Sequence, residues 1–309
     1  MKKIFLLITA AAMSAGVMFA QDINQATESY NNGAMELQMG NKEAALEHFQ
    51  TALSMAEALG DEGMDIANNC KGTIPALMAS IAKDMIKAEN YEGALEQLAK
   101  TAEVAELYGA SDVVEDAKTL VPQVHMSKGN DLLNAKDFAG AAAAYQQVLD
   151  ADAANGMAAL RLGMALGSQG KVAEAEAAYL QAAANGQEKN AHKQLSTIYV
   201  KQAQAASKAK KYQETIDFAA KSNEYLENAN AYRLAAGAAQ QLGKNAECIG
   251  FYEKYIALKP NAKDAGAVKY TIAALYQQTG NKEKAKEYYQ MIVSDPQYGA
   301  TAQEQLKTL

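Results

Sequence analysis

The chain is poor in the residues that most metal and catalytic sites require. Its 309 residues include two cysteines, three histidines and no tryptophan. His48, His125 and His192 lie far apart, and no Cys-x2-Cys, His-x3-His or HExxH spacing occurs, so a zinc site has no ligand set. The phosphate-binding loop and the Gly-x-Ser-x-Gly nucleophile elbow are also missing from the sequence. We therefore expect no enzyme activity, no bound metal and no cofactor.

Proline is scarce as well, with four residues, and β-branched runs are absent. Alanine is abundant, and 49% hydrophobic with 21% charged residues is ordinary for a globular protein with a continuous core. Composition therefore predicts an all-α protein. Carboxylate pairs such as Glu174/Glu176 and Glu224/Glu227 fall in helical stretches. Nothing nearby would raise one pKa, so we interpret them as solvated helix faces.

Acidic residues outnumber basic ones, 36 to 29, which argues against a nucleic-acid partner. The charge is unevenly distributed along the chain. Residues 21–150 hold 21 acids and 8 bases, whereas residues 151–309 hold 15 acids and 19 bases. One interpretation is that the charge of solvent-exposed helix faces varies along the chain without a functional role. The other is a polarised molecule whose acidic half meets a basic partner, or whose halves meet head to tail.

The N-terminus has the features of a secretory leader. Lys2 and Lys3 precede an apolar stretch over residues 4–19, and Ala20 stands before Gln21. This pattern predicts a signal peptide over 1–20, cleaved near Ala20, and resembles bacterial leaders. The alternative, an uncleaved anchor, is disfavoured because the stretch is short for a spanning helix. With no lipid-anchor cysteine near the cleavage site, we expect a periplasmic or secreted protein without a membrane span in its mature chain.

One spacing pattern recurs along the rest of the chain. A small residue, followed four residues later by an aromatic or apolar one, returns at intervals of 33 to 49 residues. The small positions are Ala45, Ala94, Ala141, Ala175, Thr215, Cys248 and Ala285, and the later ones are Phe49, Leu98, Tyr145, Tyr179, Ala219, Tyr252 and Tyr289. Fixed-period self-similarity predicts an array of helix pairs. The small residue lets two helices cross closely, and the large one fills the gap to the neighbouring pair.

Glycines mark the turn inside several of these repeats. Gly40, Gly170, Gly243 and Gly280 stand where the first helix of a pair must end, as expected of a helix C-terminal glycine. The fifth repeat departs from the pattern, because Lys210, Thr215 and Ala219 occupy its glycine, alanine and aromatic positions.

This pattern resembles the tetratricopeptide repeat (TPR) family over about residues 25–309. The chain departs from the family in having no tryptophan and in its longer first three repeats. The resemblance implies a right-handed α-solenoid of about seven TPR-like helix pairs, with residues 298–309 as a capping helix. We divide the mature chain into elongated repeats one to three, over 21–150, and regular repeats four to seven with the cap, over 151–309.

The long repeats contain prolines at matching places. Pro75 and Pro122 each follow an apolar-periodic stretch, which predicts an elongated first helix that is kinked or broken at the proline. Cys70 and Cys248 lie about four repeats apart. Helices stack at roughly 10 Å, so the two thiols are too far apart for a disulfide and are predicted free.

The resemblance also implies a binding surface, because the first helices of TPR pairs line a concave groove. Carrying that frame over gives the candidate binding residues Met126, Asn130, Leu160, Arg161, Met164, Gln204, Arg233, Tyr270 and Gln277. Methionines suit adaptable contacts, although plain inter-helix core is an equal alternative for them. Amides suit hydrogen bonds to a peptide backbone or to sugar hydroxyls.

Two further features of this surface bear on recognition. Arginine occurs only at Arg161 and Arg233, where it serves either carboxylate recognition or a structural ion pair. Some TPR domains grip a C-terminal carboxylate with lysines and asparagines. Asn130 matches one such asparagine, but Met126 stands where the lysine is expected, so that clamp is incomplete.

The leading hypothesis is a non-catalytic protein–protein interaction scaffold of the periplasm or cell envelope that binds a segment of a partner protein in the groove. The alternative is an envelope protein that captures glycans or peptides, prompted by Tyr270, Gln277 and Gln278. Self-association by end-to-end stacking is a third possibility, prompted by the charge asymmetry.

Overall fold

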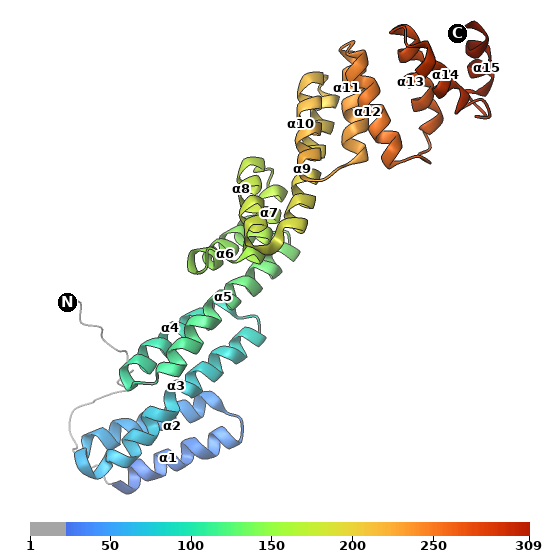
Figure 1. The fold of residues 1–309 in the computed structure, drawn as a ribbon. Helices are drawn as coiled ribbons and strands as arrows, with labels where there is room; N and C mark the ends of the chain where they lie inside the picture. Colours follow the sequence, from blue (N-terminus) through green and yellow to red (C-terminus); the bar gives the residue numbers. More distant parts are fainter. Residues whose placement is uncertain (1–22) are drawn as a thin grey trace. The chain divides into compact units, whose positions relative to one another are not determined.

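The structure is a computed structural model that describes residues 23–309, and this part of the chain is built from helices (Figure 1). Two short non-α segments, η1 (Gly60–Gly63) and η2 (Ala183–Gln187), interrupt the series. The α-helices are α1 (Ile23–Gln38), α2 (Lys42–Ala58), α3 (Met64–Lys87), α4 (Tyr91–Tyr108), α5 (Ser111–Asn134), α6 (Phe138–Ala151), α7 (Gly156–Ser168), α8 (Val172–Ala182), α9 (Glu188–Lys208), α10 (Tyr212–Tyr225), α11 (Ala229–Gln241), α12 (Asn245–Leu258), α13 (Ala265–Gln278), α14 (Lys282–Gln290) and α15 (Gly299–Thr308).

These helices form seven consecutive pairs, α1/α2 to α13/α14, followed by α15, which confirms the predicted all-α array with a final capping helix. The chain divides into two compact units between Val124 and His125, inside α5. We call them the N-terminal and the C-terminal unit. In each unit, α1 to α4 and α6 to α15 respectively, each helix packs against the next one in sequence. The division at residue 150, which followed repeat length, stays a prediction.

The crossing positions of the repeat behave as their spacing predicts. All seven small residues, from Ala45 to Ala285, are 0% exposed. Of the seven residues four positions later, all are buried except Tyr252, which is half-buried. Thr215 fits the buried crossing because its hydroxyl donates to the backbone oxygen of Lys211, four residues earlier, at 3.0 Å. The degenerate fifth repeat therefore keeps the same packing.

The repeat also places a glycine opposite its aromatic residue. A Cβ on Gly163 of α7 would lie 2.7 Å from the ring of Tyr179 on α8, and Gly129 stands in the same relation to Tyr145. A larger residue would therefore separate the paired helices. Tyr179 and Tyr145 are among the buried residues of one core cluster in the C-terminal unit. Their tyrosine character is thus explained by packing.

The two prolines of the long repeats lie inside uninterrupted helices. Pro75 is within α3 and Pro122 is within α5, so the broken-helix alternative is wrong and the predicted elongation holds, while a kink at either proline stays a prediction. An interior proline costs about 3 kcal/mol. Around Pro75 that cost is offset by the burial of Ile74, Leu77 and Met78, at roughly 1.5–3 kcal/mol for each fully buried side chain.

Cys70 and Cys248 are both free and buried, as predicted. Burial raises the pKa of each thiol to about 11, so each thiol is protonated and unreactive at neutral pH. None of the helices in residues 23–309 has the length and apolar character needed to cross a bilayer. The predicted signal peptide and its cleavage near Ala20 lie outside the described residues.

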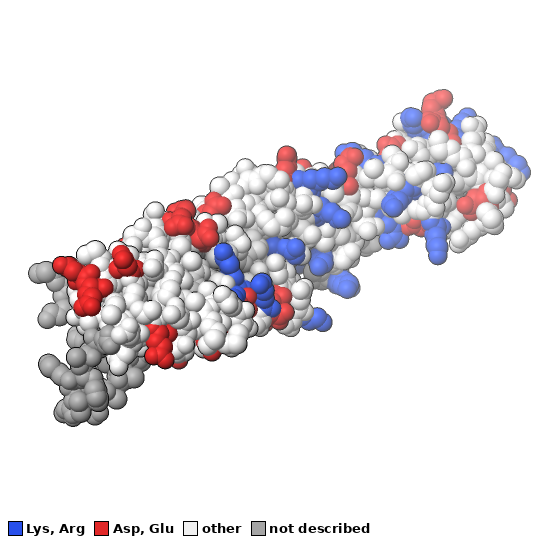
Figure 2. Space-filling view, turned by 90° about the horizontal axis from the view of Figure 1, so that it is seen from below, with Lys and Arg blue, Asp and Glu red and all other residues white. Residues whose placement is uncertain are grey.

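The two units differ in charge. Residues 23–124 hold 17 acids and 6 bases, whereas residues 125–309 hold 18 acids and 21 bases. On the face drawn in Figure 2, acidic side chains predominate over the N-terminal helices and lysines over the C-terminal ones. An anionic partner would therefore be attracted to the C-terminal unit rather than to the N-terminal one.

Candidate binding groove

In the third and fourth repeats, the candidate groove residues border the core. Met126 on α5 and Met164 on α7 are half-buried and pack against the same core cluster, which matches the core interpretation of the methionines. Leu160 belongs to that core and is 8% exposed, so it offers almost no surface to a partner.

The polar candidates of this region serve a core tyrosine. The amide oxygen of Asn130 accepts a hydrogen bond from the Tyr145 hydroxyl at 2.8 Å. Burial raises the pKa of Tyr145, and the nearby charge of Arg161 opposes that shift. Asn130 therefore satisfies a buried hydroxyl, and Arg161 lies close enough for its charge to act on Tyr145. Gln204 of α9, in the fifth repeat, is exposed.

In the seventh repeat, the chain covers its own groove face. The Tyr270 ring packs against Tyr289 at 5.8 Å and stacks on Tyr298 at 5.3 Å between ring centroids. Gln277 accepts from the Tyr289 hydroxyl at 3.0 Å, and its amide donates to Gln305 of α15 at 3.1 Å. The C-terminal segment therefore engages both candidates, Tyr270 and Gln277, which leaves little of either free to bind a ligand.

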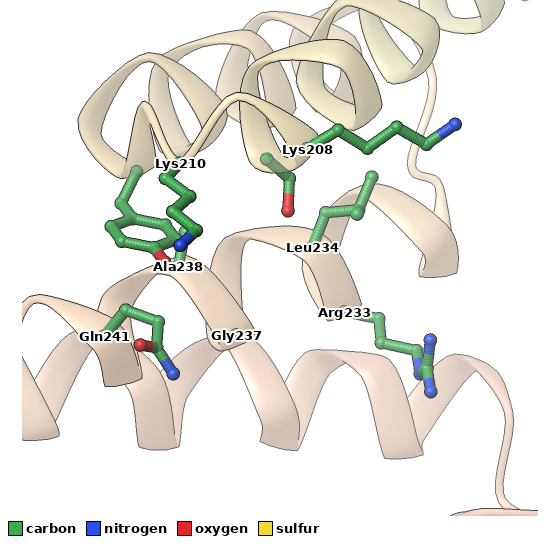
Figure 3. A pocket seen from close by; sticks show the side chains of 9 residues that line it. Lys208, Lys210, Arg233, Leu234, Gly237, Ala238 and Gln241 are labelled. Atoms are coloured by element: carbon green, nitrogen blue, oxygen red, sulfur yellow. The ribbon is translucent and has the colours of Figure 1, made fainter.

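Between the fifth and sixth repeats the same face is open. A hollow of about 430 Å³ lies between the end of α9, the α9–α10 turn, the start of α10 and α11 (Figure 3). We call it the α9–α11 hollow. Its lining residues are Ser207, Lys208, Lys210, Tyr212, Arg233, Leu234, Gly237, Ala238 and Gln241. Its volume lies in the range of small-molecule and side-chain pockets.

One groove position that borders the hollow lacks a side chain. Gly237, Met164 and Ala274 each stand eleven residues before the crossing residue of their repeat. A Cβ built on Gly237 would meet no atom within 4 Å. A glycine in a helix interior costs roughly 0.5–1 kcal/mol relative to alanine. Packing therefore does not account for glycine at this position, unlike Gly163, and its effect is to leave space.

Arg233 stands at one end of the hollow and is held by an ion pair. Its Nε donates to Asp264 at 2.6 Å, and Asp264 also accepts from the Tyr255 hydroxyl at 2.7 Å. The hydrogen bond to Asp264 raises the pKa of the guanidinium. The structural ion pair, one of the two sequence-based alternatives for Arg233, is thus present. It also fixes this side chain beside the hollow.

Carboxylates elsewhere in the C-terminal unit are tied into structural networks. Glu176 accepts from Lys221 at 3.3 Å and from the Tyr225 hydroxyl at 3.1 Å. Burial alone would raise the pKa of Glu176, but hydrogen bonds from its tyrosine and lysine neighbours outweigh burial and lower it. This carboxyl is therefore a poor general acid at neutral pH. Among residues 23–309, no cluster of three or more His, Cys, Asp or Glu side chains is arranged to hold a metal ion.

Sequence analysis selected Arg233 but missed other residues of the hollow. Lys210 and Tyr212 lie in or after the turn, which the helix-based frame does not cover. For Lys210 the signal was a lysine at the turn position that four other repeats give to glycine, which we interpreted as degeneracy. Gly237 stands four residues after Arg233 on the same helix, but it carries no side chain to suggest a contact.

Comparison with known proteins supports the repeat assignment. One tetratricopeptide repeat family model matches residues 126–190, and a second matches residues 267–292. These segments, in the third to fourth repeats and in the seventh, therefore match the tetratricopeptide repeat pattern. No curated protein sequence matches this chain at a significant level.

Solved structures provide more distant likenesses. MamA AMB-1 is 25% identical, with a TM-score of 0.36, covering 56% of this chain and 90% of its own. YrrB, described as a TPR protein with an unusual peptide-binding site, is 16% identical, with a TM-score of 0.34, covering 65% of this chain and 97% of its own. At these TM-scores the likenesses carry no functional argument.

Proposed function

We propose that this chain is a non-catalytic interaction scaffold of the periplasm or cell envelope, whose C-terminal unit binds an extended segment of a partner protein. The observation that carries the proposal is the α9–α11 hollow, which opens at positions where the repeat frame puts the binding groove. The tetratricopeptide repeats support it, because such repeats commonly form protein-binding surfaces.

The contrast between the covered residues of the seventh repeat and the open α9–α11 hollow favours a peptide over a glycan as the ligand. Tyr270 and Gln277 prompted the glycan alternative, and both are engaged by the C-terminal segment. The hollow instead combines polar donors with Leu234, Ala238 and the backbone of Gly237, which suits a side chain of an extended peptide.

Filling the hollow tests this function. The protein is incubated with an array of immobilised decapeptides of varied composition, and affinities for bound peptides are measured in solution. We expect Gly237→Leu to weaken binding roughly tenfold or more, because the new side chain occupies the open space. The matched control is Gly250→Leu on α12, where a Cβ also meets no atom within 4 Å but which does not line the hollow. Equal effects of the two substitutions would refute the groove assignment.

The compartment is proposed from the leader sequence alone and has its own test. Expression of the full chain in a bacterium, followed by fractionation and mass measurement, should give a periplasmic or secreted protein shortened by about twenty residues. A full-length protein retained in the cytoplasm would contradict this part of the proposal.

A further inference from the structure

The α9–α11 hollow carries cations without acidic partners. Nearby lysines are neutralised: Lys211 pairs with Glu214 at 3.0 Å, and Lys244 pairs with Glu247 at 3.2 Å. Within residues 23–309, Lys208 and Lys210 have no such carboxylate partner, and no aspartate or glutamate lines the hollow. With Arg233 held by Asp264, two uncompensated positive charges remain at this site.

Lys210 occupies an unusual backbone position. Four of the seven turns inside the helix pairs use a glycine at positive φ, and the other three use Glu89 (φ +59°), Lys136 and Lys210 (φ +57°). A non-glycine residue in this left-handed region is strained. Lys136 has φ +64° in the turn before α6, yet it does not line the hollow. Figure 3 shows Lys210 extending from its turn toward α11. Lys210 therefore adds a positive charge to the hollow from a turn position that four of the seven helix pairs give to glycine.

The remaining lining suits a carboxylate on a short apolar stem. Leu234, Gly237 and Ala238 of α11 provide an apolar floor, and Figure 3 shows Gln241 at the same end as Lys210. Gln241 and Ser207 add neutral hydrogen-bond donors. Lysine ammonium groups bind carboxylates as mobile point charges, which tolerates different approach directions.

We propose that the α9–α11 hollow binds a carboxylate of an acidic peptide segment through Lys210, with Lys208 adding a second positive charge at the other end, and thereby selects acidic partners. This inference rests on the proposed function and specifies its ligand chemistry. The acidic group belongs to a segment of a partner protein, and the acidic N-terminal unit of a second copy of this chain is the competing source that the light-scattering test below would reveal.

The first test compares matched peptides. Each acidic decapeptide bound on the array is paired with a counterpart in which every aspartate and glutamate is replaced by its amide and the C-terminus is amidated. We expect the acidic member to bind at least about tenfold more tightly and to weaken as salt is raised. Amide counterparts that bind equally well would overturn the inference while leaving segment binding intact. If no peptide binds at all, the proposed function fails together with the inference.

The second test separates charge from strain. Lys210→Gly and Lys136→Gly each relieve a strained turn, so both should raise Tm, by about 2–4 °C. Only Lys210→Gly should weaken acidic-peptide binding, by roughly fivefold to tenfold. A more stable protein with lower affinity cannot be explained by unfolding. Equal affinities in the two variants would overturn the assignment of Lys210.

Light scattering identifies the source of the acidic group. Association of the free protein that is lost in high salt and in Lys210→Gly, but kept in Lys136→Gly, would support a second copy as the source. A monomer that still prefers acidic peptides would support another protein.

Discussion

The sixth and seventh repeats place different side chains on the same face of the same frame. Arg233 and Tyr270 occupy one frame position, Gly237 and Ala274 the next, and Gln241 and Gln278 a third. In the seventh repeat, Tyr270 stacks on Tyr298 just before α15. In the sixth repeat, the corresponding face borders a hollow. The same position in the repeat therefore has different roles. Tyr298 and α15 cover this face of the seventh repeat, whereas the same face of the sixth repeat is open.

A substitution that disrupts the covered seventh repeat should cause the largest loss of stability. Ala302 of α15 is 0% exposed and packs in a cluster with Ala273, Ala285 and Tyr289. Ala302→Glu should lower the free energy of unfolding by roughly 3 kcal/mol, because the helix must bury an unpaired charge or detach. Urea unfolding followed by circular dichroism gives this value.

The neighbouring exposed position provides the control for that change. Thr301→Glu adds the same charge on the same helix and should alter stability by less than about 0.5 kcal/mol. Acidic-peptide affinity of the folded Ala302→Glu protein should stay within about twofold of the wild type, since α15 does not line the hollow. If Ala302→Glu were as harmless as Thr301→Glu, α15 would not be closing the stack.

Replacing Asp264, the partner of Arg233 in the open sixth repeat, should cause a smaller loss of stability that depends on pH. Burial alone would raise the pKa of Asp264, but its bonds to Tyr255 and Arg233 lower it overall. The stabilisation from a depressed carboxyl pKa is present above the unfolded value of about 3.9 and is lost as pH falls through the folded value. Asp264→Asn should therefore cost about 0.5–1 kcal/mol at pH 7, a modest amount because Arg233 is more than half exposed.

Unfolding measured at several pH values tests this linkage. The difference between wild type and Asp264→Asn should shrink as pH falls below about 4. A difference that stays constant from pH 7 to pH 3 would mean that titration of Asp264 is not coupled to folding.

Local spacing was sufficient to predict the helix pairs. The burial of Ala175 and Tyr179 follows from side chains four residues apart on one helical face, and it recurs in the other repeats except at Tyr252, which is half-buried. The covering of Tyr270 could not be predicted this way, because its stacking on Tyr298 depends on how the last segment folds back. The continuity of α3 through Pro75 likewise depends on tertiary burial that outweighs a local preference.

The candidate site was predicted only in part, for a related reason. The repeat frame pointed to Arg233, since it projects from a first helix. It did not select Gly237, because a glycine has no side chain, or Lys210, because this residue lies in a turn and not on a helix. A hollow depends on how several helices and turns are arranged in space. Sequence periodicity predicts only which residues share a face of one helix.

The most direct test of the difference between the sixth and seventh repeats places the same probe on the corresponding face of each. A photo-crosslinking amino acid is introduced at Gln241 or at Gln278, exposed residues that each stand seven positions before the crossing residue of their repeat. The labelled protein is irradiated with an acidic peptide selected from the array, and the crosslinked fraction is measured by mass spectrometry. We predict efficient crosslinking from Gln241 and little from Gln278. Equal crosslinking at both positions, or a preference for Gln278, would contradict the account.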